Sequence, residues 1–320
     1  MTALIDRIHE ADSAIRPHVM VSPLERSNAL SVELGCDVWL KAEHLQATGS
    51  FKLRGATNKV RLVAGEHDEV ITASTGNHGR AVAHAAAAFG VKAIVYVAKT
   101  TQPMKMAAIR DAGADLLTID GSVLDAELAA RAESERRGIP YVAAYNDLDT
   151  VAGQGTIGVE LVRQAPDLDA VFVCVGCGGL AGGLGAALKA LSPATRVVGV
   201  SAAASTCMID SLRAGEIIET PESDTLADGS AGAVEPGSVT FPICQEVLDE
   251  VLTVSELEIA QAMRKVAAGN NWMIEGSAGV AVAGLIQTAE RYRGKKVAVV
   301  LCGRNIALDT FLGALELGRA

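Results

Sequence analysis

Lys52 is the residue of this chain with the clearest chemical potential. It lies in the run Ser50–Gly55, beside Phe51 and on a turn that is predicted to open a helix. Burial of an amine lowers its pKa and leaves a free nucleophile, which is the state that a Schiff-base lysine needs. These six residues alone fit an ordinary lysine at a helix start equally well, because propensity is a weak guide. Other motifs must decide between the two interpretations.

A glycine-rich turn follows the apolar run Val171–Val175 and precedes a helical pattern. Its residues are Gly176, Cys177, Gly178, Gly179 and Leu180. Backbone N–H groups and the helix dipole make such a turn an anion site, whereas the alternative is a closely packed turn without a ligand. A dinucleotide is disfavoured because the next predicted strand, Val197–Ser201, ends without a carboxylate, and ATP because no Gly-Lys-Ser/Thr tripeptide occurs. The turn therefore predicts a small phosphorylated cofactor.

Two further loops carry polar side chains at the ends of predicted strands. The first holds Ser74, Thr75, Gly76, Asn77 and His78 just before a predicted helix. Its hydroxyl and backbone N–H groups could bind a carboxylate, although helix capping explains the same residue types. The second is Cys302–Asn305, which closes the last predicted strand, where open α/β sheets bind ligands.

These loops need elements that place them together. Apolar β-branched runs alternate with helical patterns almost throughout, which favours βαβ units and parallel sheets. The predicted strands are Val38–Ala42, Val70–Ser74, Ala93–Ala98, Leu116–Asp120, Tyr141–Ala144, Val171–Val175, Val197–Ser201 and Val297–Cys302. The predicted helices include Gly79–Phe89, Met104–Ala112, Leu180–Leu191 and Gly276–Arg291. Glu216–Thr240, rich in glycine, proline, serine and aspartate, is expected to be a long functional loop.

Composition limits the class of protein. At 320 residues the chain is expected to form two domains, and its 49% hydrophobic content can fill both cores. A net charge of -10 without a basic cluster argues against nucleic acid, and no apolar run is long enough for a membrane span. The six cysteines are scattered, which favours free thiols and a cytoplasmic protein. Cys174 and Cys177 lack the further ligands of a metal or redox motif.

The motifs occur together in one family. The chain resembles the fold type II (β-family) pyridoxal-phosphate enzymes, in the branch of threonine/serine dehydratases and serine racemase. The matching segments are Ser50–Gly55, Ser74–Gly79, Ala152–Thr156, Gly176–Leu180, Ala227–Gly229 and Cys302–Asn305. The resemblance implies a tryptophan synthase β-like fold: two open, mostly parallel sheets flanked by helices, with pyridoxal 5′-phosphate between a large domain (1–67 plus 148–320) and a small one (68–147). It implies a homodimer, and because the sequence ends at Ala320 no C-terminal regulatory domain is expected.

The resemblance also implies roles for individual residues. Lys52 would carry the cofactor and later move the Cα proton, Phe51 would lie near the cofactor ring, and Asn77 would bond its phenolic oxygen. Cys302 would be a neutral partner of the pyridine nitrogen. The cofactor phosphate would be bound by Gly176, Cys177, Gly178, Gly179 and Leu180. The substrate carboxylate would be bound by Ser74, Thr75, Gly76, Asn77 and His78.

The implied reaction is elimination of water from a small β-hydroxy amino acid, giving a 2-oxo acid and ammonia. The chain departs from the branch in three respects. Ser201 and Cys207 replace the cation ligands of serine racemase, so no metal site is expected. Thr75 replaces the racemase's serine on the far face, where it is still a candidate catalytic residue, and Arg304 replaces a glycine.

Alternative functions stay open. The loop sequences are similar to those of dehydratases associated with hydroxyectoine utilisation, which would act on a hydroxylated amino-acid derivative. Other possible activities are a serine or aspartate racemase and a β-replacement synthase. A binding protein that has lost catalysis is the alternative outside enzymes.

Overall fold

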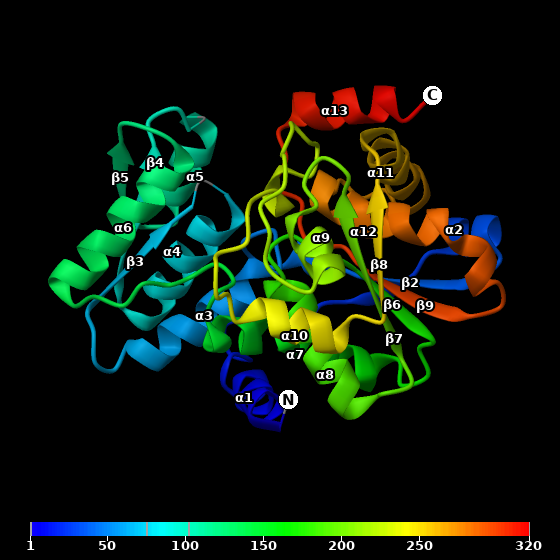
Figure 1. Ribbon diagram of the computed structural model, residues 1–320, viewed down its shortest axis with the longest axis horizontal. Helices are drawn as coiled ribbons and strands as arrows, with labels where there is room; N and C mark the ends of the chain where they lie inside the picture. Colours follow the sequence, from blue (N-terminus) through cyan, green and yellow to red (C-terminus); the bar gives the residue numbers. More distant parts are fainter. Residues whose placement is uncertain (1, 75, 102, 320) are drawn as a thin grey trace.

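A computed structural model describes residues 2–74, 76–101 and 103–319. The described part of the chain forms two separate sheets with helices around them (Figure 1). The larger sheet has six strands, in the order β1 (Leu24–Arg26), β2 (Asp37–Lys41), β9 (Lys296–Val300), β6 (Ala170–Cys174), β7 (Arg196–Ala202) and β8 (Glu250–Val254). Only the β1–β2 pair is antiparallel among these described strands. The smaller sheet is parallel and consists of β3 (Glu69–Ala73), β4 (Lys92–Ala98) and β5 (Asp115–Ile119).

Helices cover both sheets. Those nearest the smaller sheet are α4 (Asn77–Phe89), α5 (Pro103–Asp111) and α6 (Val123–Arg137). The others are α1 (Thr2–Ala14), α2 (Asn28–Leu34), α3 (Lys52–Val63), α7 (Leu148–Gln164), α8 (Gly179–Leu191), α9 (Cys207–Ala214), α10 (Thr240–Val247), α11 (Glu256–Asn270), α12 (Gly276–Gln287) and α13 (Leu308–Leu317). The predicted pair of open, mostly parallel sheets flanked by helices is confirmed.

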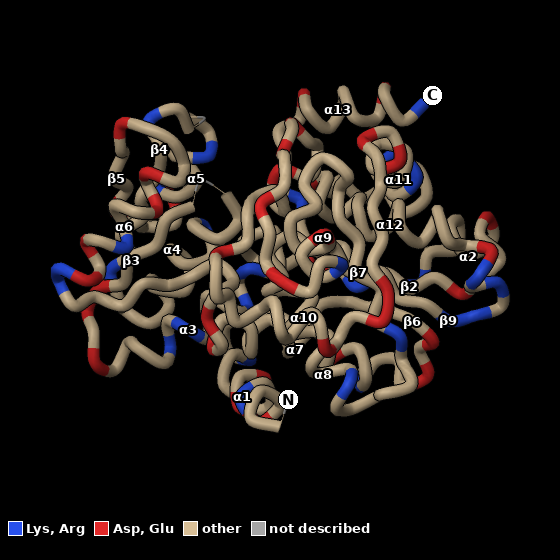
Figure 2. Tube along the Cα trace, viewed as in Figure 1, with Lys and Arg blue, Asp and Glu red and all other residues tan. Residues whose placement is uncertain are grey.

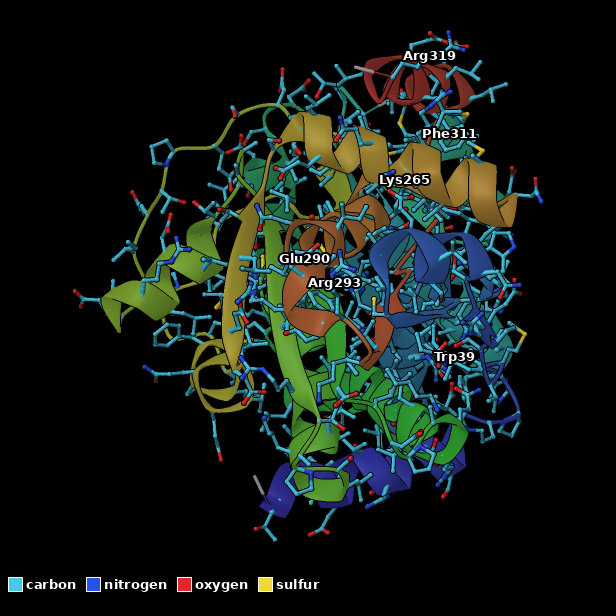
Figure 3. All side chains as sticks on the ribbon, turned by 90° about the vertical axis from the view of Figure 1, so that its right-hand side faces the viewer. Trp39, Lys265, Glu290, Arg293, Phe311 and Arg319 are labelled. Atoms are coloured by element: carbon cyan, nitrogen blue, oxygen red, sulfur yellow. The ribbon has the colours of Figure 1, made fainter. Side chains whose placement is uncertain are left out.

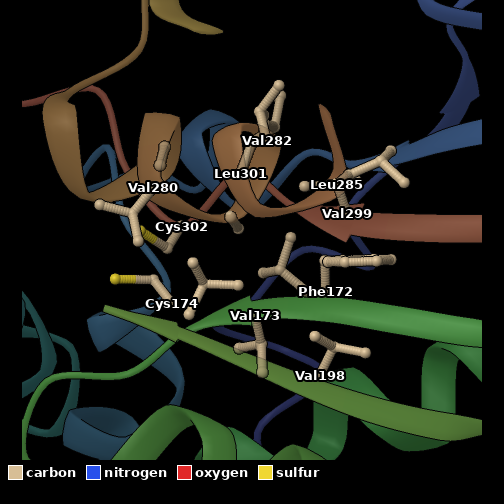
Figure 4. Close-up of a cluster of buried hydrophobic side chains, with 14 of the residues drawn as sticks. Phe172, Val173, Cys174, Val198, Val280, Val282, Leu285, Val299, Leu301 and Cys302 are labelled. Atoms are coloured by element: carbon tan, nitrogen blue, oxygen red, sulfur yellow. The ribbon is translucent and has the colours of Figure 1, made fainter. Parts of the chain in front are cut away.

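The main core lies between the six-stranded sheet and α12. Phe172 and Val173 of β6 lie on opposite sides of that strand. Val299 of β9 and Val280 of α12 lie on the same side of the sheet as Phe172 (Figure 4). All four side chains are fully buried. This burial explains why β6 and β9 are continuous apolar runs rather than alternating ones.

Local signals fix the ends of several helices. Gly90 ends α4 in the left-handed conformation, at φ +68°, as its position after Phe89 predicts. Ser255 begins α11 by accepting the backbone N–H of Glu258, whose side chain bonds back. Outside α11 lies α13, and Figure 3 labels Lys265 on the first helix and Phe311 on the second. Arg264 donates to the carbonyl of Leu315 across this contact, at 3.1 Å.

The structure differs from the predicted local structure at three strands. Tyr141–Ala144 is not a strand, because only Tyr141 forms a bridge, to Ile71. The strands β1 and β8 were not predicted from the sequence. Both are edge strands of the larger sheet, and β8 is only partly buried, so neither carries a long apolar run. The segment from Glu216 to the start of α10 is a long loop, as predicted, with one short helical turn at Asp228–Ser230.

Charges are dispersed over the fold. Lys and Arg alternate with Asp and Glu along the trace in Figure 2, without a basic stripe in the described part of the chain. Many are paired on the surface, as are Glu290 and Arg293 at 2.6 Å (Figure 3). Among the described helices, none combines the length and apolar character needed to cross a membrane.

Candidate active site

Lys52 is the first residue of α3 and is partly buried. Its Nζ donates to the carbonyl of Ala144 at 3.0 Å and lies 5.3 Å from the centre of the Phe51 ring. Burial lowers the pKa of Lys52, against the opposing influence of Cys177, Cys302 and Glu275. A lowered pKa increases the fraction of free amine, so this environment suits a nucleophile.

The end of β9 is joined directly to the lysine motif. The N–H of Phe51 donates to the carbonyl of Cys302 at 3.0 Å, and Ser50 forms an antiparallel bridge with Gly303. Lys52 and Cys302, which are 250 positions apart in the sequence, are therefore brought together. Cys302 is buried beside Cys174 (Figure 4), and burial raises its pKa far above the usual thiol value. Its thiol is thus neutral.

The turn Gly176–Leu180 has the free donors of an anion site. Among the described residues, no acceptor lies within hydrogen-bond reach of the backbone N–H groups of Gly176, Cys177 and Gly178. Gly178 has φ +86°, and a Cβ there would lie 2.8 Å from Cys244 Sγ. The turn is held from outside by Thr240, whose hydroxyl donates to the carbonyl of Cys177 at 2.7 Å. These N–H groups at the start of α8 fit a phosphate.

A short segment connects the turn to the lysine. A Cβ built on Gly179 would lie 3.0 Å from the Cβ of Tyr145, and Tyr145 follows Ala144, the acceptor of the Lys52 amine. The Lys52 amine and the turn Gly176–Leu180 therefore both lie against the segment Ala144–Tyr145. Glycines also let the helices approach closely here, because a Cβ on Gly153 of α7 would lie 2.6 Å from the backbone of Gly55 in α3.

The loop before α4 contributes the other predicted polar groups. Ser74 Oγ accepts the N–H of Gly76 at 3.2 Å, and Asn77 is the first residue of α4. His78 is buried and donates from Nε2 to the carbonyl of Val142 at 2.9 Å. Burial, together with the charge of Lys52, lowers the pKa of His78 to about 3, so its ring is neutral at pH 7. Thr75, predicted as catalytic and substrate-binding, lies outside the described residues.

Glu275 is a site residue that the sequence did not reveal. It precedes α12 and is 5% exposed. Its two carboxylate oxygens accept from Asn77 Nδ2, at 2.9 and 3.2 Å. The backbone N–H of Asn305 also donates to it, at 2.9 Å. Burial raises the pKa of Glu275 to about 7. A single acidic residue in the apolar stretch Trp272–Gly276 was the one available signal.

Beneath α3 lies a buried ionic cluster, which we define as Lys41, Glu43, Arg54 and Glu160. Arg54 donates to Glu43 Oε2 at 2.7 Å and to Glu160 Oε1 at 2.7 Å. Lys41 bonds the other Glu160 oxygen at 2.6 Å. None of these four side chains is more than 1% exposed. The cluster joins the first turn of α3, and hence Lys52, to α7 and β2.

The predicted absence of a cation site concerns Ser201 and Cys207. Ser201 donates to the carbonyl of Val175 at 2.5 Å, and Cys207 donates to the carbonyl of Ile218 at 3.2 Å. Over residues 2–74, 76–101 and 103–319, no group of three or more His, Cys, Asp or Glu side chains could hold a metal ion. All six cysteines, which lie in these ranges, are free thiols.

Comparison with known proteins indicates the same cofactor class as the residues of the site. The model of a family described as pyridoxal-phosphate dependent enzyme matches residues 15–303. The L-threonine ammonia-lyase of Geobacter sulfurreducens is 37% identical over 313 residues, which are 97% of this chain and 78% of that protein. The L-threo-3-hydroxyaspartate ammonia-lyase of Saccharomyces cerevisiae is 33% identical over 304 residues, covering 94% and 93%. The structure of the processed threonine deaminase isoform 2 from Solanum lycopersicum superposes with a TM-score of 0.95 at 32% identity, covering 100% of this chain and 94% of that one.

Proposed function

Since this chain belongs to the family of pyridoxal-phosphate-dependent enzymes, we propose that it eliminates water from a small β-hydroxy amino acid, giving a 2-oxo acid and ammonia. The observation that supports this most is the position of the Lys52 amine, which contacts Ala144 beside the unbonded N–H groups of Gly176–Gly178. The names of the relatives, threonine and 3-hydroxyaspartate ammonia-lyases, suggest the substrate class.

The residues present fit the cofactor. Gly176, Cys177, Gly178, Gly179 and Leu180 would hold its phosphate, and Lys52, Asn77 and Cys302 would surround its ring, with Phe51 beside it. The chemistry supplied by the bound cofactor is an electron sink for the Cα carbanion. The neutral thiol of Cys302 would leave the ring nitrogen unprotonated, which favours elimination over racemisation.

Lys52 and the α4 loop would carry out the protein's part of the reaction. The lowered pKa of Lys52 lets its amine accept the Cα proton, and Nζ then holds that proton near the departing hydroxyl. The Ser74–His78 loop would bind the substrate carboxylate at the start of α4, with the N–H groups of Asn77 and His78 and the hydroxyls of Ser74 and Thr75 as donors. Thr75, which lies outside the described residues, stays a candidate catalytic residue. The His78 ring is neutral and uses its Nε2 donor on the Val142 carbonyl, so His78 would contribute its backbone N–H rather than act as an acid.

The larger organisation is also a proposal. We divide the chain into a large unit, 1–67 with 148–320, and a small unit, 68–147, since β3, β4 and β5 all come from the latter. Six free thiols suit a reducing compartment, so we propose a cytoplasmic enzyme. We propose a homodimer on the resemblance to its family, and sedimentation velocity tests this assembly.

The decisive experiment combines a spectrum with a product assay. The reconstituted protein should show an absorption band of bound cofactor, and Lys52→Ala should lose that band and reduce turnover on the order of 10³-fold. Lys189→Ala, at the opposite end of α8, is the control and should retain both. A substrate panel of threonine, serine, 3-hydroxyaspartate and hydroxylated diaminobutyrate derivatives identifies the side chain. D-serine without any 2-oxo acid would refute the dehydratase, and a protein that cannot be reconstituted would refute every enzyme interpretation.

A further inference from the structure

Four side chains form a continuous chain of hydrogen bonds at the edge of the site. We call it the amide relay and define it as Arg80, Asn305, Asn77 and Glu275. Arg80 Nη1 donates to Asn305 Oδ1 at 2.6 Å, and Asn305 Nδ2 donates to Asn77 Oδ1 at 2.5 Å. Asn77 Nδ2 then donates to Glu275 Oε1 at 2.9 Å. The members come from α4, from the loop after β9 and from the residue before α12, so the relay exists only in the folded chain.

The two ends of the relay set its direction. A guanidinium can only donate hydrogen bonds, and an ionised carboxylate can only accept them. An amide can do both, and its orientation is decided by its neighbours. Because Arg80 can only donate, it fixes the Asn305 amide, which in turn directs the N–H groups of Asn77 towards the Glu275 oxygens. Turning Asn77 over would place its oxygen against Glu275 and its nitrogen against the nitrogen of Asn305.

Further contacts hold the same orientation. Asn305 Nδ2 also donates to the carbonyl of Thr48 at 2.9 Å, and the backbone N–H of Asn305 donates to Glu275 Oε2 at 2.9 Å. Gly303 leaves room for the carboxylate, because a Cβ there would lie 2.5 Å from Glu275 Oε1. Glu275 is buried, while Asn77, Arg80 and Asn305 are partly buried. The site is therefore built around this arrangement.

The charges at the two ends of the relay have no ion-pair partner in the described part of the chain. Among the described residues, neither Arg80 nor Glu275 has an oppositely charged side chain within 4.0 Å, although most arginines of the chain do. A cation and an anion are instead joined through two amides. Hydrogen bonds in such a series polarise one another, so each amide N–H becomes a stronger donor.

We propose that Arg80 and Glu275 are positioning residues, which hold the Asn77 amide with an N–H directed at the cofactor. The proposal rests on the proposed function, in which Asn77 bonds the phenolic oxygen of the cofactor. The two oxygens of the Glu275 carboxylate share one N–H of Asn77 Nδ2, at 2.9 and 3.2 Å, and the other N–H stays available as a strengthened donor. This donor stabilises negative charge on the oxygen that it meets.

The test measures cofactor binding and spectrum rather than turnover. In Arg80→Met the cofactor dissociation constant should rise about tenfold, because one hydrogen bond to a charged group is lost. The pH at which the cofactor absorption changes should shift in the same variant. Arg80→Lys, which keeps a cationic donor, should recover most of both properties. Arg110→Met is the control, since Arg110 is exposed in α5 and has no ion pair among the described residues, and it should match the wild type.

A double-mutant cycle completes the test. If the relay acts as a unit, Arg80→Met combined with Glu275→Gln should weaken cofactor binding no more than the stronger single change. Thermal unfolding of the apoproteins separates this effect from loss of folding. Strict additivity, or an unchanged spectrum and dissociation constant in Arg80→Met, overturns the relay but leaves the proposed function intact. A wild-type protein that binds no cofactor overturns the proposed function itself.

Discussion

Replacing Glu160 by Gln should reveal how strongly the buried ionic cluster holds the lysine helix in place. Glu160 is the shared acceptor of the buried Arg54, at 2.7 Å, and Lys41, at 2.6 Å, and also of the partly exposed Arg16, at 2.5 Å. The substitution keeps the shape of the side chain and removes its charge. Two fully buried cations would then share only Glu43 as an anion.

The size of the effect follows from the pKa of Glu160. Burial alone would raise this pKa, but the charges and hydrogen bonds of Arg54 and Lys41 prevail and hold it at about 2 instead of 4.5. The difference between these two pKa values corresponds to about 3 kcal/mol of folding free energy. Breaking a buried ion pair on one side typically costs about 3–5 kcal/mol. We therefore expect Glu160→Gln to lose about 3–5 kcal/mol of stability at pH 7.

Urea unfolding of the apoproteins measures this loss. Because the folded pKa of Glu160 is depressed, its contribution is complete above pH 4.5 and disappears as the pH falls towards 2. The difference between wild type and variant should shrink over that window. Glu10→Gln is the control, since the Glu10 side chain is 64% exposed and its pair with Arg61 should contribute less than about 1 kcal/mol. A loss below about 1 kcal/mol for Glu160→Gln, or one independent of pH, would show that the cluster is not held as described.

Two further substitutions test the site itself. Gly178→Ala should destabilise the apoprotein by about 2–4 kcal/mol in urea unfolding, because φ is +86° and the new Cβ meets Cys244. Gly215→Ala, at φ +83° in open space, should lose only about 1–2 kcal/mol, and equal losses would contradict the steric argument. Glu275→Gln should stabilise the apoprotein by about 1–3 kcal/mol at pH 8, because the folded protein raises the pKa of Glu275 to about 7. Burial is the main cause and Asp228 adds to it, whereas Asn77, Asn305 and Lys105 lower this pKa. The contribution of Glu275 is complete below pH 4.5 and lost as the pH rises through 7, so a gain equal at pH 5 and pH 8 would refute this assignment.

Much of the architecture could be predicted from the sequence, because it depends on local patterns. Val171–Val175 and Val297–Cys302 are apolar runs whose strands, β6 and β9, are buried on both faces. Glycine after Phe89 marks a helix end that depends on one backbone conformation. The edge strand β1 has only three residues, none of them buried, and the bridge at Tyr141 depends on Ile71, so the residues themselves give no strand signal.

The candidate site divides in the same way. Lys52 and the turn after β6 could be identified because each depends on residues adjacent in sequence. Glu275 could not, since its role arises from contacts with Asn77, 198 positions away. Arg80 contacts Asn305 over 225 positions. Side-chain hydrogen bonds of this kind require coordinates, because no periodicity or spacing encodes them.

The position of β2 between β1 and β9 has a consequence for synthesis of the chain. β2 ends at Lys41, but its parallel partner begins at Lys296. At about 5–20 residues per second, the ribosome would make that partner roughly 10–50 seconds later. During this interval one edge of β2 stays unpaired and Phe51, the neighbour of Lys52, lacks its backbone bond to Cys302, whereas β3, β4 and β5 can already pair. The emerging chain therefore contains Lys52 long before the loop after β9 completes the site. The unpaired edge of β2 is a place where a chaperone would bind.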